Sequence, residues 1–216
     1  MKKIIITLTF SLFAILSYAQ FFVGGQLGFN STINTAKPNV GIEQKTRNTA
    51  FAIVPSAGYQ FKNKFALGLR PNLMLQNETA VNYFGSNDDY KTKSMIFAFE
   101  AFGQYTFVKF GKWSIYADAG VGLGKGKSKM TYGSSSEDLL ETTIWGINIK
   151  PVLAYDLSEK IKLLANLNFL GLVFTSTKIE DQQTTSKTTE NIFDFSVNTD
   201  NLFTIGAIQI GAIYKF

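Results

Sequence analysis

The sequence predicts an all-β fold, an eight-stranded antiparallel up-and-down transmembrane β-barrel. Three observations carry this prediction. Apolar residues alternate with polar or small ones over eight long segments, the connections between the segments alternate in length, and the chain ends on an aromatic residue. A tilted strand needs about nine to eleven residues to cross a bilayer, and every segment is at least that long. The eight expected strands are residues 20–31, 49–62, 65–79, 93–110, 113–128, 142–156, 161–176 and 201–216.

A cleavable signal peptide is expected ahead of the barrel. Two lysines precede an apolar run over residues 4–16, and Ser17 and Ala19 place small residues at the two positions that a signal peptidase reads. The run is short for a membrane-spanning helix. The expected organisation is therefore a signal peptide at residues 1–19, cleaved near Ala19, and a single barrel domain at residues 20–216.

The alternation also predicts which face of each strand meets lipid. In one segment Trp145, Ile147 and Ile149 share a face, whereas Asn148 and Lys150 lie on the other. The interior of an eight-stranded barrel is just wide enough for side chains to fill it. Rows of large apolar side chains from every strand would overfill that space, so the apolar faces are expected outside and the polar and small residues inside.

The connections predict the orientation. Short turns are expected on the periplasmic side and long polar loops outside, and an even number of strands then leaves both termini in the periplasm. Prolines inside strands remove a hydrogen-bond donor, so a local irregularity is expected at Pro55, Pro71 and Pro151. The short turns are residues 62–64, 110–112 and 157–160, and the long loops are residues 32–48, 80–92, 129–141 and 177–200.

The composition excludes several classes of function. The 216 residues contain neither histidine nor cysteine, which rules out a Ser-His-Asp or Cys-His catalytic arrangement, thiolate metal sites and disulfides. The formal net charge of +5 is weak and forms no basic run, so nucleic acid is not an expected partner. The interpretation is a protein that is not an enzyme, with no cofactor and no metal; the acidic pairs in the loops are read as solvated charge.

Four glycines at alternate positions precede Lys127-Ser128 and invite comparison with a phosphate-binding loop. The spacing fails, because the first glycine of that motif would fall on Val121. The period of two instead places all four on the inward face of one strand, where they leave room for larger side chains opposite. These glycines are Gly120, Gly122, Gly124 and Gly126.

The inward charges form two expected pairs. Arg70 and Glu100 flank one long loop symmetrically, and Asp118 and Lys150 flank the next. An unpaired charge in a narrow lumen costs several kcal/mol, so each residue is expected to pair with the other. The favoured interpretation is a structural plug of salt bridges; a polar relay or gated narrow pore is the alternative.

The last residues resemble a known assembly signal. A polar residue, a glycine, an apolar residue and a terminal aromatic stand at Gln209, Gly211, Tyr214 and Phe216. With the amphipathic strands and the signal peptide, this pattern is similar to the small bacterial outer-membrane barrels of the OmpA/OmpX type, the "outer membrane protein beta-barrel domain" or porin family. The resemblance implies residence among outer-membrane lipid, after insertion by the barrel-assembly machinery.

The resemblance implies no substrate, so three functions stay open. The first is a surface barrel that works through its external loops in adhesion, partner binding or envelope integrity. The second is narrow, porin-like transport of small solutes or apolar molecules. The third is an accessory role in a secretion or assembly machinery.

Overall fold

The computed structural model describes residues 19–36, 44–61, 64–81, 90–132, 135–167, 170–182, 184, 186–197 and 208–216. The predicted signal peptide lies outside these residues, apart from Ala19. Within the described part no helix is long and apolar enough to cross a membrane. The strands are β1 (Ala19–Ala36), β2 (Gln44–Phe61), β3 (Phe65–Val81), β4 (Tyr90–Phe110), β5 (Trp113–Tyr132), β6 (Ser135–Asp156), β7 (Ile161–Leu167), β8 (Leu170–Asp181), β9 (Lys187–Val197) and β10 (Ile208–Lys215).

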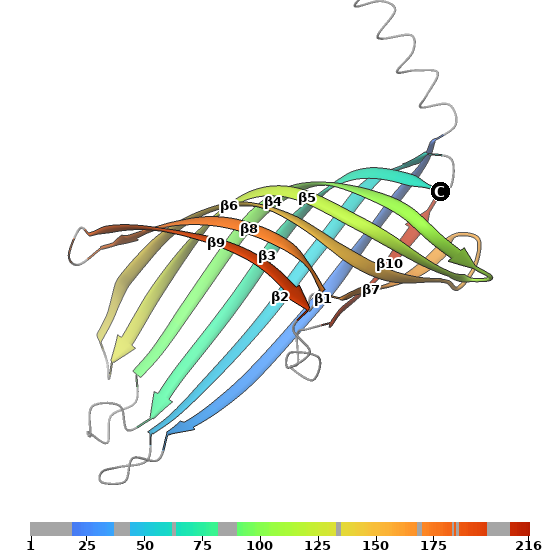
Figure 1. The fold of residues 1–216 in the computed structure, drawn as a ribbon. Coiled ribbons are helices and arrows are strands. Elements are labelled where there is room, and N and C mark those ends of the chain that lie inside the picture. The colour runs from blue at the N-terminus through green and yellow to red at the C-terminus, as the bar shows by residue number, and fades with distance from the viewer. Residues whose placement is uncertain are drawn as a thin grey trace, which may run out of the picture.

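Eight of these strands form a closed antiparallel ring, which confirms the predicted fold class. Each of the strands β1 to β6 pairs with the next one along the chain, and the ring continues from β6 through β7 and β10 back to β1. Figure 1 shows the long strands β1 to β5 running side by side, with the C-terminus at one end of the ring. We call the end that holds Phe216 and the start of β1 the terminus side, and the opposite end the loop side.

The seventh predicted strand is divided in the structure. Strand β6 pairs with β7 near the terminus side and with β8 near the loop side, so the predicted strand 161–176 is broken into two. Strand β9 forms a hairpin with β8. The prediction of a loop over residues 177–200 was therefore wrong. Strand β9 carries exposed Phe193 and Phe195 at alternate positions, and they face Phe174 and Leu172 of β8 in the ladder. Residues 201–207 of the last predicted strand lie outside the described residues.

The break between β7 and β8 reverses which positions face outward. Val152 pairs with Asn166, whereas Ile149, three residues back along β6, pairs with Leu172, six residues onward. The chain between Asn166 and Leu172 is therefore three residues longer than the stretch of β6 between Val152 and Ile149, and an odd number of inserted residues inverts the alternation beyond them. This is the irregularity expected at Pro151.

The other two strand prolines lie opposite each other. The β2–β3 ladder holds Ile53 against Leu73 and resumes with Ala57 against Leu69, so it is interrupted where Pro55 would face Pro71. Neither proline has an N–H to donate, and placing both at one position confines the loss to a single gap. The irregularity expected at these prolines is confirmed, and both strands continue across it.

The strands also extend beyond the predicted boundaries on the loop side. Strand β6 begins at Ser135 rather than at residue 142, and β1 continues to Ala36 rather than ending at residue 31. The predicted loops 32–48, 80–92 and 129–141 are correspondingly shorter. Their polar arms stay in strand conformation because backbone pairing continues past the apolar band, as the ladder from Lys127 and Glu141 to Tyr132 and Ser135 shows.

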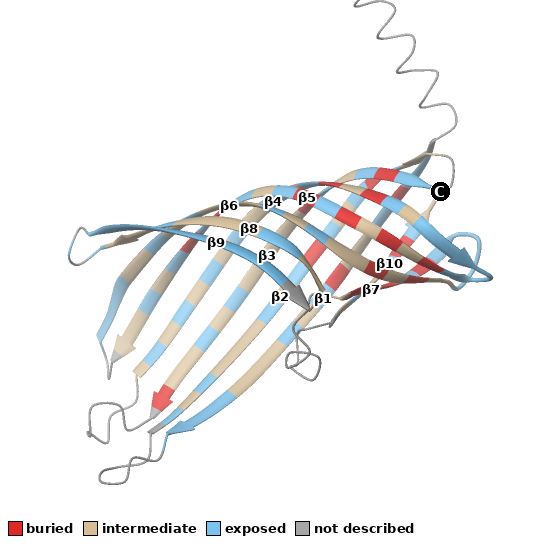
Figure 2. Ribbon diagram, in the orientation of Figure 1, coloured by how far each residue is buried: buried red, intermediate tan, exposed pale blue. Residues whose placement is uncertain are grey.

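The apolar faces point outward, as predicted. Leu123 is 69% exposed and Phe97 is 52% exposed, whereas inward residues of the same strands are covered. Figure 2 shows most buried residues gathered in the terminus-side half of the ring. That half encloses a small apolar core, which consists of Phe22, Ala66, Phe102, Tyr116, Val152, Ala154, Leu164 and Ile213.

Two paired glycines make room for this core. Gly58 and Gly68 face each other across β2 and β3. A Cβ on Gly58 would lie 2.7 Å from the Cζ atom of Phe22, and one on Gly68 would lie 2.6 Å from that of Phe102. Each inward phenylalanine therefore occupies the space that a glycine on the adjacent strand leaves, since Phe22 faces Gly58 and Phe102 faces Gly68 in the ladders.

Candidate functional site: the charged layer of the lumen

A layer of charged side chains crosses the lumen next to the apolar core, with Arg70 at its centre. Arg70 is 2% exposed and lies directly opposite Glu100 in the β3–β4 ladder. Its Nη2 atom donates to Glu100 Oε1 at 2.7 Å, and its Nη1 atom donates to Asp118 Oδ2 at 3.0 Å. The predicted Arg70–Glu100 pair is confirmed. Both carboxylates are held by one guanidinium, whose planar fork suits such binding.

The predicted pair of Asp118 and Lys150 is wrong. The two residues face each other in the β5–β6 ladder, yet Asp118 accepts hydrogen bonds from Arg70 and, at 2.7 Å, from Gln104 Nε2. No ion pair within 4.0 Å joins Lys150 to a described residue. The sequence argument paired charges on neighbouring strands only, whereas in a narrow lumen the long Arg70 side chain reaches from β3 to β5.

Neutral groups complete the layer. Asn148 Nδ2 donates to Glu100 Oε1 at 3.0 Å, and the Arg70 guanidinium carbon lies 4.5 Å from the centre of the Phe102 ring. A Cβ on Gly120 would lie only 1.7 Å from Glu100 Oε1. The row of alternate glycines on β5 thus makes room for side chains of β4, as the sequence predicted. With Arg70 and Lys150 against Glu100 and Asp118, the formal charges of the layer sum to zero.

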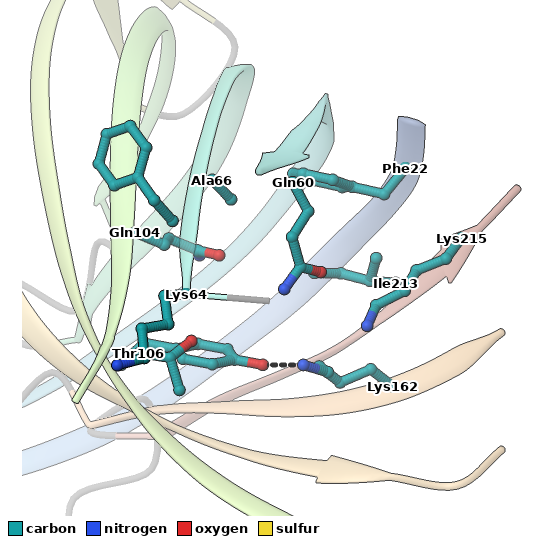
Figure 3. Close-up of a pocket in the computed structure, with 11 residues that line it drawn as sticks. Phe22, Gln60, Lys64, Ala66, Gln104, Thr106, Lys162, Ile213 and Lys215 are labelled. Atoms are coloured by element: carbon teal, nitrogen blue, oxygen red, sulfur yellow. Dashed lines mark hydrogen bonds between the residues drawn. The ribbon is translucent and has the colours of Figure 1, made fainter. Parts of the chain in front are cut away.

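A second polar cluster closes the terminus-side mouth, and the sequence analysis missed it. Lys162 is 6% exposed; its Nζ atom donates to the Tyr116 hydroxyl and lies 3.4 Å from Asp156 Oδ1. Figure 3 shows Lys162 in this pocket, with Lys215 on a neighbouring strand. The cavity that remains there is only about 20 Å³. Asp156 and Lys162 are paired across a short turn, and the symmetry argument used for the long loops would have found them.

The loop-side half of the lumen is hollow by comparison. A cavity of about 270 Å³ lies against the charged layer, where Glu100, Asn72 and Asn148 contribute polar groups. The side-chain oxygens of Asn72 and Asn148 are buried and have no hydrogen-bond partner among the described groups. A further cavity of about 170 Å³ lies beside β1, β2 and β3. The remaining lining of the larger cavity includes Ala98, Gly122, Gly124, Ile144, Gly146, Val173 and Thr175.

The predicted assembly signal lies on β10 and ends in contact with β1. Phe216 donates its backbone N–H to the Phe21 carbonyl at 3.0 Å, and the two rings are 5.4 Å apart. Tyr214 packs edge to face on Phe216 with centroids 5.1 Å apart. Gly211 faces Gln26 in the ladder, where a Cβ would lie 2.3 Å from the Gly25 carbonyl oxygen. The remaining residue of the signal, Gln209, lines the smaller cavity.

The contacts of the charged layer are ion pairs and hydrogen bonds among its own side chains. The described residues contain no group of three or more potential metal ligands. Both carboxylates of the charged layer accept hydrogen bonds from the Arg70 guanidinium, and Lys150 supplies the second positive charge of the layer. A hydrogen-bonded ion cluster backed by an apolar core is a barrier to water and ions, since any solute would have to separate the charges.

Comparison with known proteins identifies similar folds. No protein-family model matches the sequence, and no curated protein matches it. A major outer membrane protein from Thermus thermophilus aligns with a TM-score of 0.48 and 12% identity, covering 92% of this chain and 99% of that one. Outer Membrane Protein W of E. coli aligns with a TM-score of 0.46 and 12% identity, covering 92% and 98%. Neisserial surface protein A aligns with a TM-score of 0.37 and 15% identity, covering 92% and 99%.

Proposed function

We propose that the protein is an integral outer-membrane barrel without enzymatic activity, that its lumen is closed, and that it acts through its loop-side end. One observation carries this proposal: the Arg70 layer and the apolar core together fill the terminus-side half of the lumen. The exposed apolar exterior supports residence in a membrane. The signal peptide and the Phe216 pattern expected from the sequence support the outer membrane in particular.

The orientation is part of the same proposal, with both termini periplasmic and the loop side external. The chain contains no cysteine, so single cysteines introduced at Ser136 and Glu159 report on the two ends separately. A membrane-impermeant maleimide added to intact cells is expected to label Ser136→Cys and to spare Glu159→Cys until the envelope is opened. The reverse pattern would refute the orientation.

Conductance measurements test the closed lumen. The purified barrel, folded as judged by a heat-dependent shift in gel mobility, is expected to leave a planar bilayer silent. Step-like currents from folded wild-type protein would refute the proposal. The matched variant combines Arg70→Ala, Glu100→Ala, Asp118→Ala and Lys150→Met, which removes all four charges of the layer and keeps the apolar core. Its conductance, compared with that of wild type, shows what the charges add to the barrier.

Binding or transport of a small solute is the second candidate, and the loop-side cavity favours it. The space of about 270 Å³ ends on two asparagine oxygens without partners and on Glu100. These acceptors suit a ligand that brings hydrogen-bond donors. Uptake of radiolabelled polyols by proteoliposomes tests transport. More uptake than in liposomes without protein would favour transport, whereas equal uptake would favour the closed barrel.

A further inference from the structure

A group of lysines lies on the outer wall of the barrel. Strands β4 and β5 present them on the faces that carry the exposed apolar residues lower down, and all of their side chains are exposed. They belong to adjacent strands, since Lys93 lies opposite Lys129 and Lys127 opposite Met95 in the ladder. We call this group the lysine patch; it consists of Lys91, Lys93, Lys125, Lys127 and Lys129.

The lysine patch overlaps the loop-side edge of the apolar exterior, because Met95, which is 53% exposed, lies opposite Lys127. Lys125 lies opposite Phe97, and Leu123, 69% exposed, is the next outward residue toward the terminus side. From Phe97 to Lys93 is four residues, which in a strand tilted by about 40° corresponds to a rise of roughly 10 Å. Headgroups extend several Å beyond the hydrocarbon on each side. The ammonium groups therefore lie at the height of lipid headgroups.

The charge of the lysine patch is only partly neutralised by the protein. Lys127 pairs with Glu141 at 2.7 Å, and Lys129 pairs with Asp138 at 3.1 Å. For the other three lysines, no carboxylate within 4.0 Å is found among the described residues. Like charges directly opposite each other in a ladder are destabilising, and Lys93 faces Lys129 in that way. An external anion would relieve this repulsion.

We propose that the lysine patch binds the phosphate groups of a phosphorylated glycolipid in the outer leaflet. The position decides the class of partner: the lysines lie on the wall, continuous with the lipid-facing residues, so a lipid headgroup reaches them directly. The acyl chains would lie on Phe97, Phe99 and Leu123, which are exposed on the same face. The assignment of the leaflet rests on the orientation in the proposed function.

Two lipids distinguish phosphate recognition from general lipid contact. Wild-type barrel in phosphatidylcholine nanodiscs is titrated with bisphosphorylated lipid A and with lipid A whose phosphates have been removed, and bound lipid is counted by native mass spectrometry. We expect the phosphorylated lipid to bind at least about tenfold more tightly, since each lysine near an anionic headgroup contributes about 1 kcal/mol. Equal binding of the two lipids would refute the proposal, and this test needs only the wild-type protein.

A matched pair of variants tests the location. Replacing Lys91, Lys93 and Lys125 by Gln should weaken binding of bisphosphorylated lipid A at least about tenfold, whereas replacing them by Arg should preserve it. The control carries the same change of charge at the opposite end of the barrel, where the replaced lysines are Lys64, Lys112 and Lys160; all three are exposed.

The outcomes separate this proposal from the proposed function. Unchanged lipid binding in the Gln variant, or an equal loss of binding in the control variant, would refute the lipid site. The closed barrel would still be supported by a silent planar bilayer and by the expected cysteine labelling. If wild-type protein conducts and the Gln variant still loses lipid binding, the closed lumen is refuted and the lipid site is not. Raising the salt from about 0.15 M to 1 M should also weaken wild-type binding, because it shortens the screening length from about 8 to 3 Å.

Discussion

The two halves of the lumen differ in how they are filled, although the long strands β1 to β6 run through both. The terminus-side half is packed with an apolar core, the Arg70 layer and the Lys162 cluster, and retains a cavity of about 20 Å³. The loop-side half is lined by small residues and retains about 270 Å³. The difference follows from which residues stand at inward positions: rings opposite glycines on one side, and Gly, Ala and Thr facing one another on the other. Stability should therefore reside in the packed half.

The largest effect is expected from removing Arg70. Arg70→Ala removes the guanidinium that contacts both Glu100 and Asp118 and leaves Lys150 as the remaining positive charge of the layer. Removing one partner of a buried ion cluster in this way costs about 3–5 kcal/mol. Urea unfolding of the lipid-embedded barrel, followed by its gel mobility, measures the change. Arg47→Ala, on an exposed position of β2, is the control and should unfold like wild type. Equal unfolding of the two variants would mean that the layer contributes nothing.

A smaller loss is expected for Glu100→Ala. The structure sharpens the original pairing, because Arg70 keeps Asp118 when Glu100 is removed. The hydrogen bonds from Arg70 and Asn148 are lost, and the one between the two charged groups alone contributes about 1.5–3 kcal/mol. The same unfolding measurement applies, with Glu78→Ala on the loop side as control. A loss as large as that of Arg70→Ala would show that Asp118 alone does not hold the guanidinium.

Two glycine substitutions compare the halves directly. A Cβ on Gly68 would lie 2.5 Å from the Ala57 carbonyl oxygen and 2.6 Å from Phe102, whereas one on Gly28 would lie 3.1 Å from the flexible end of Gln209. Gly68→Ala should therefore cost about 1–3 kcal/mol through overpacking, and Gly28→Ala should cost clearly less. The temperature at which half of each variant shifts from the folded to the unfolded gel mobility gives the ranking. A larger loss for Gly28→Ala than for Gly68→Ala would contradict the denser packing of the terminus-side half.

The sequence predicted the features that follow from alternation and missed those that depend on distance across the ring. Period two placed Trp145 outside and Arg70 inside, and symmetry about a loop placed Arg70 opposite Glu100. The inserted residues between β7 and β8 preserve local patterning on each side, so the reversal of parity was invisible. Phe22 and Phe102 were not singled out as inward, although each faces a glycine on the adjacent strand, Gly58 and Gly68, in the ladder. The contact of Arg70 with Asp118 was missed because it reaches past the neighbouring strand, from β3 to β5.

The smallest effect is expected for Lys150, and it tests the pairing that the structure overturned. Its ladder partner Asp118 is taken by Arg70, so Lys150→Met removes a lumen charge that has no ion-pair partner within 4.0 Å among the described residues. Because replacing a poorly compensated buried charge by an apolar group of similar volume is often neutral or stabilising, the unfolding free energy should change by less than about 1 kcal/mol or rise. Lys162→Met, which breaks contacts with Tyr116 and Asp156, is the matched control and should be destabilised. A comparable loss of unfolding free energy in both variants would mean that Lys150 stabilises Glu100 and Asp118 electrostatically without a direct contact. The stabilising charges would then extend to β6, one strand beyond the ion pairs of Arg70.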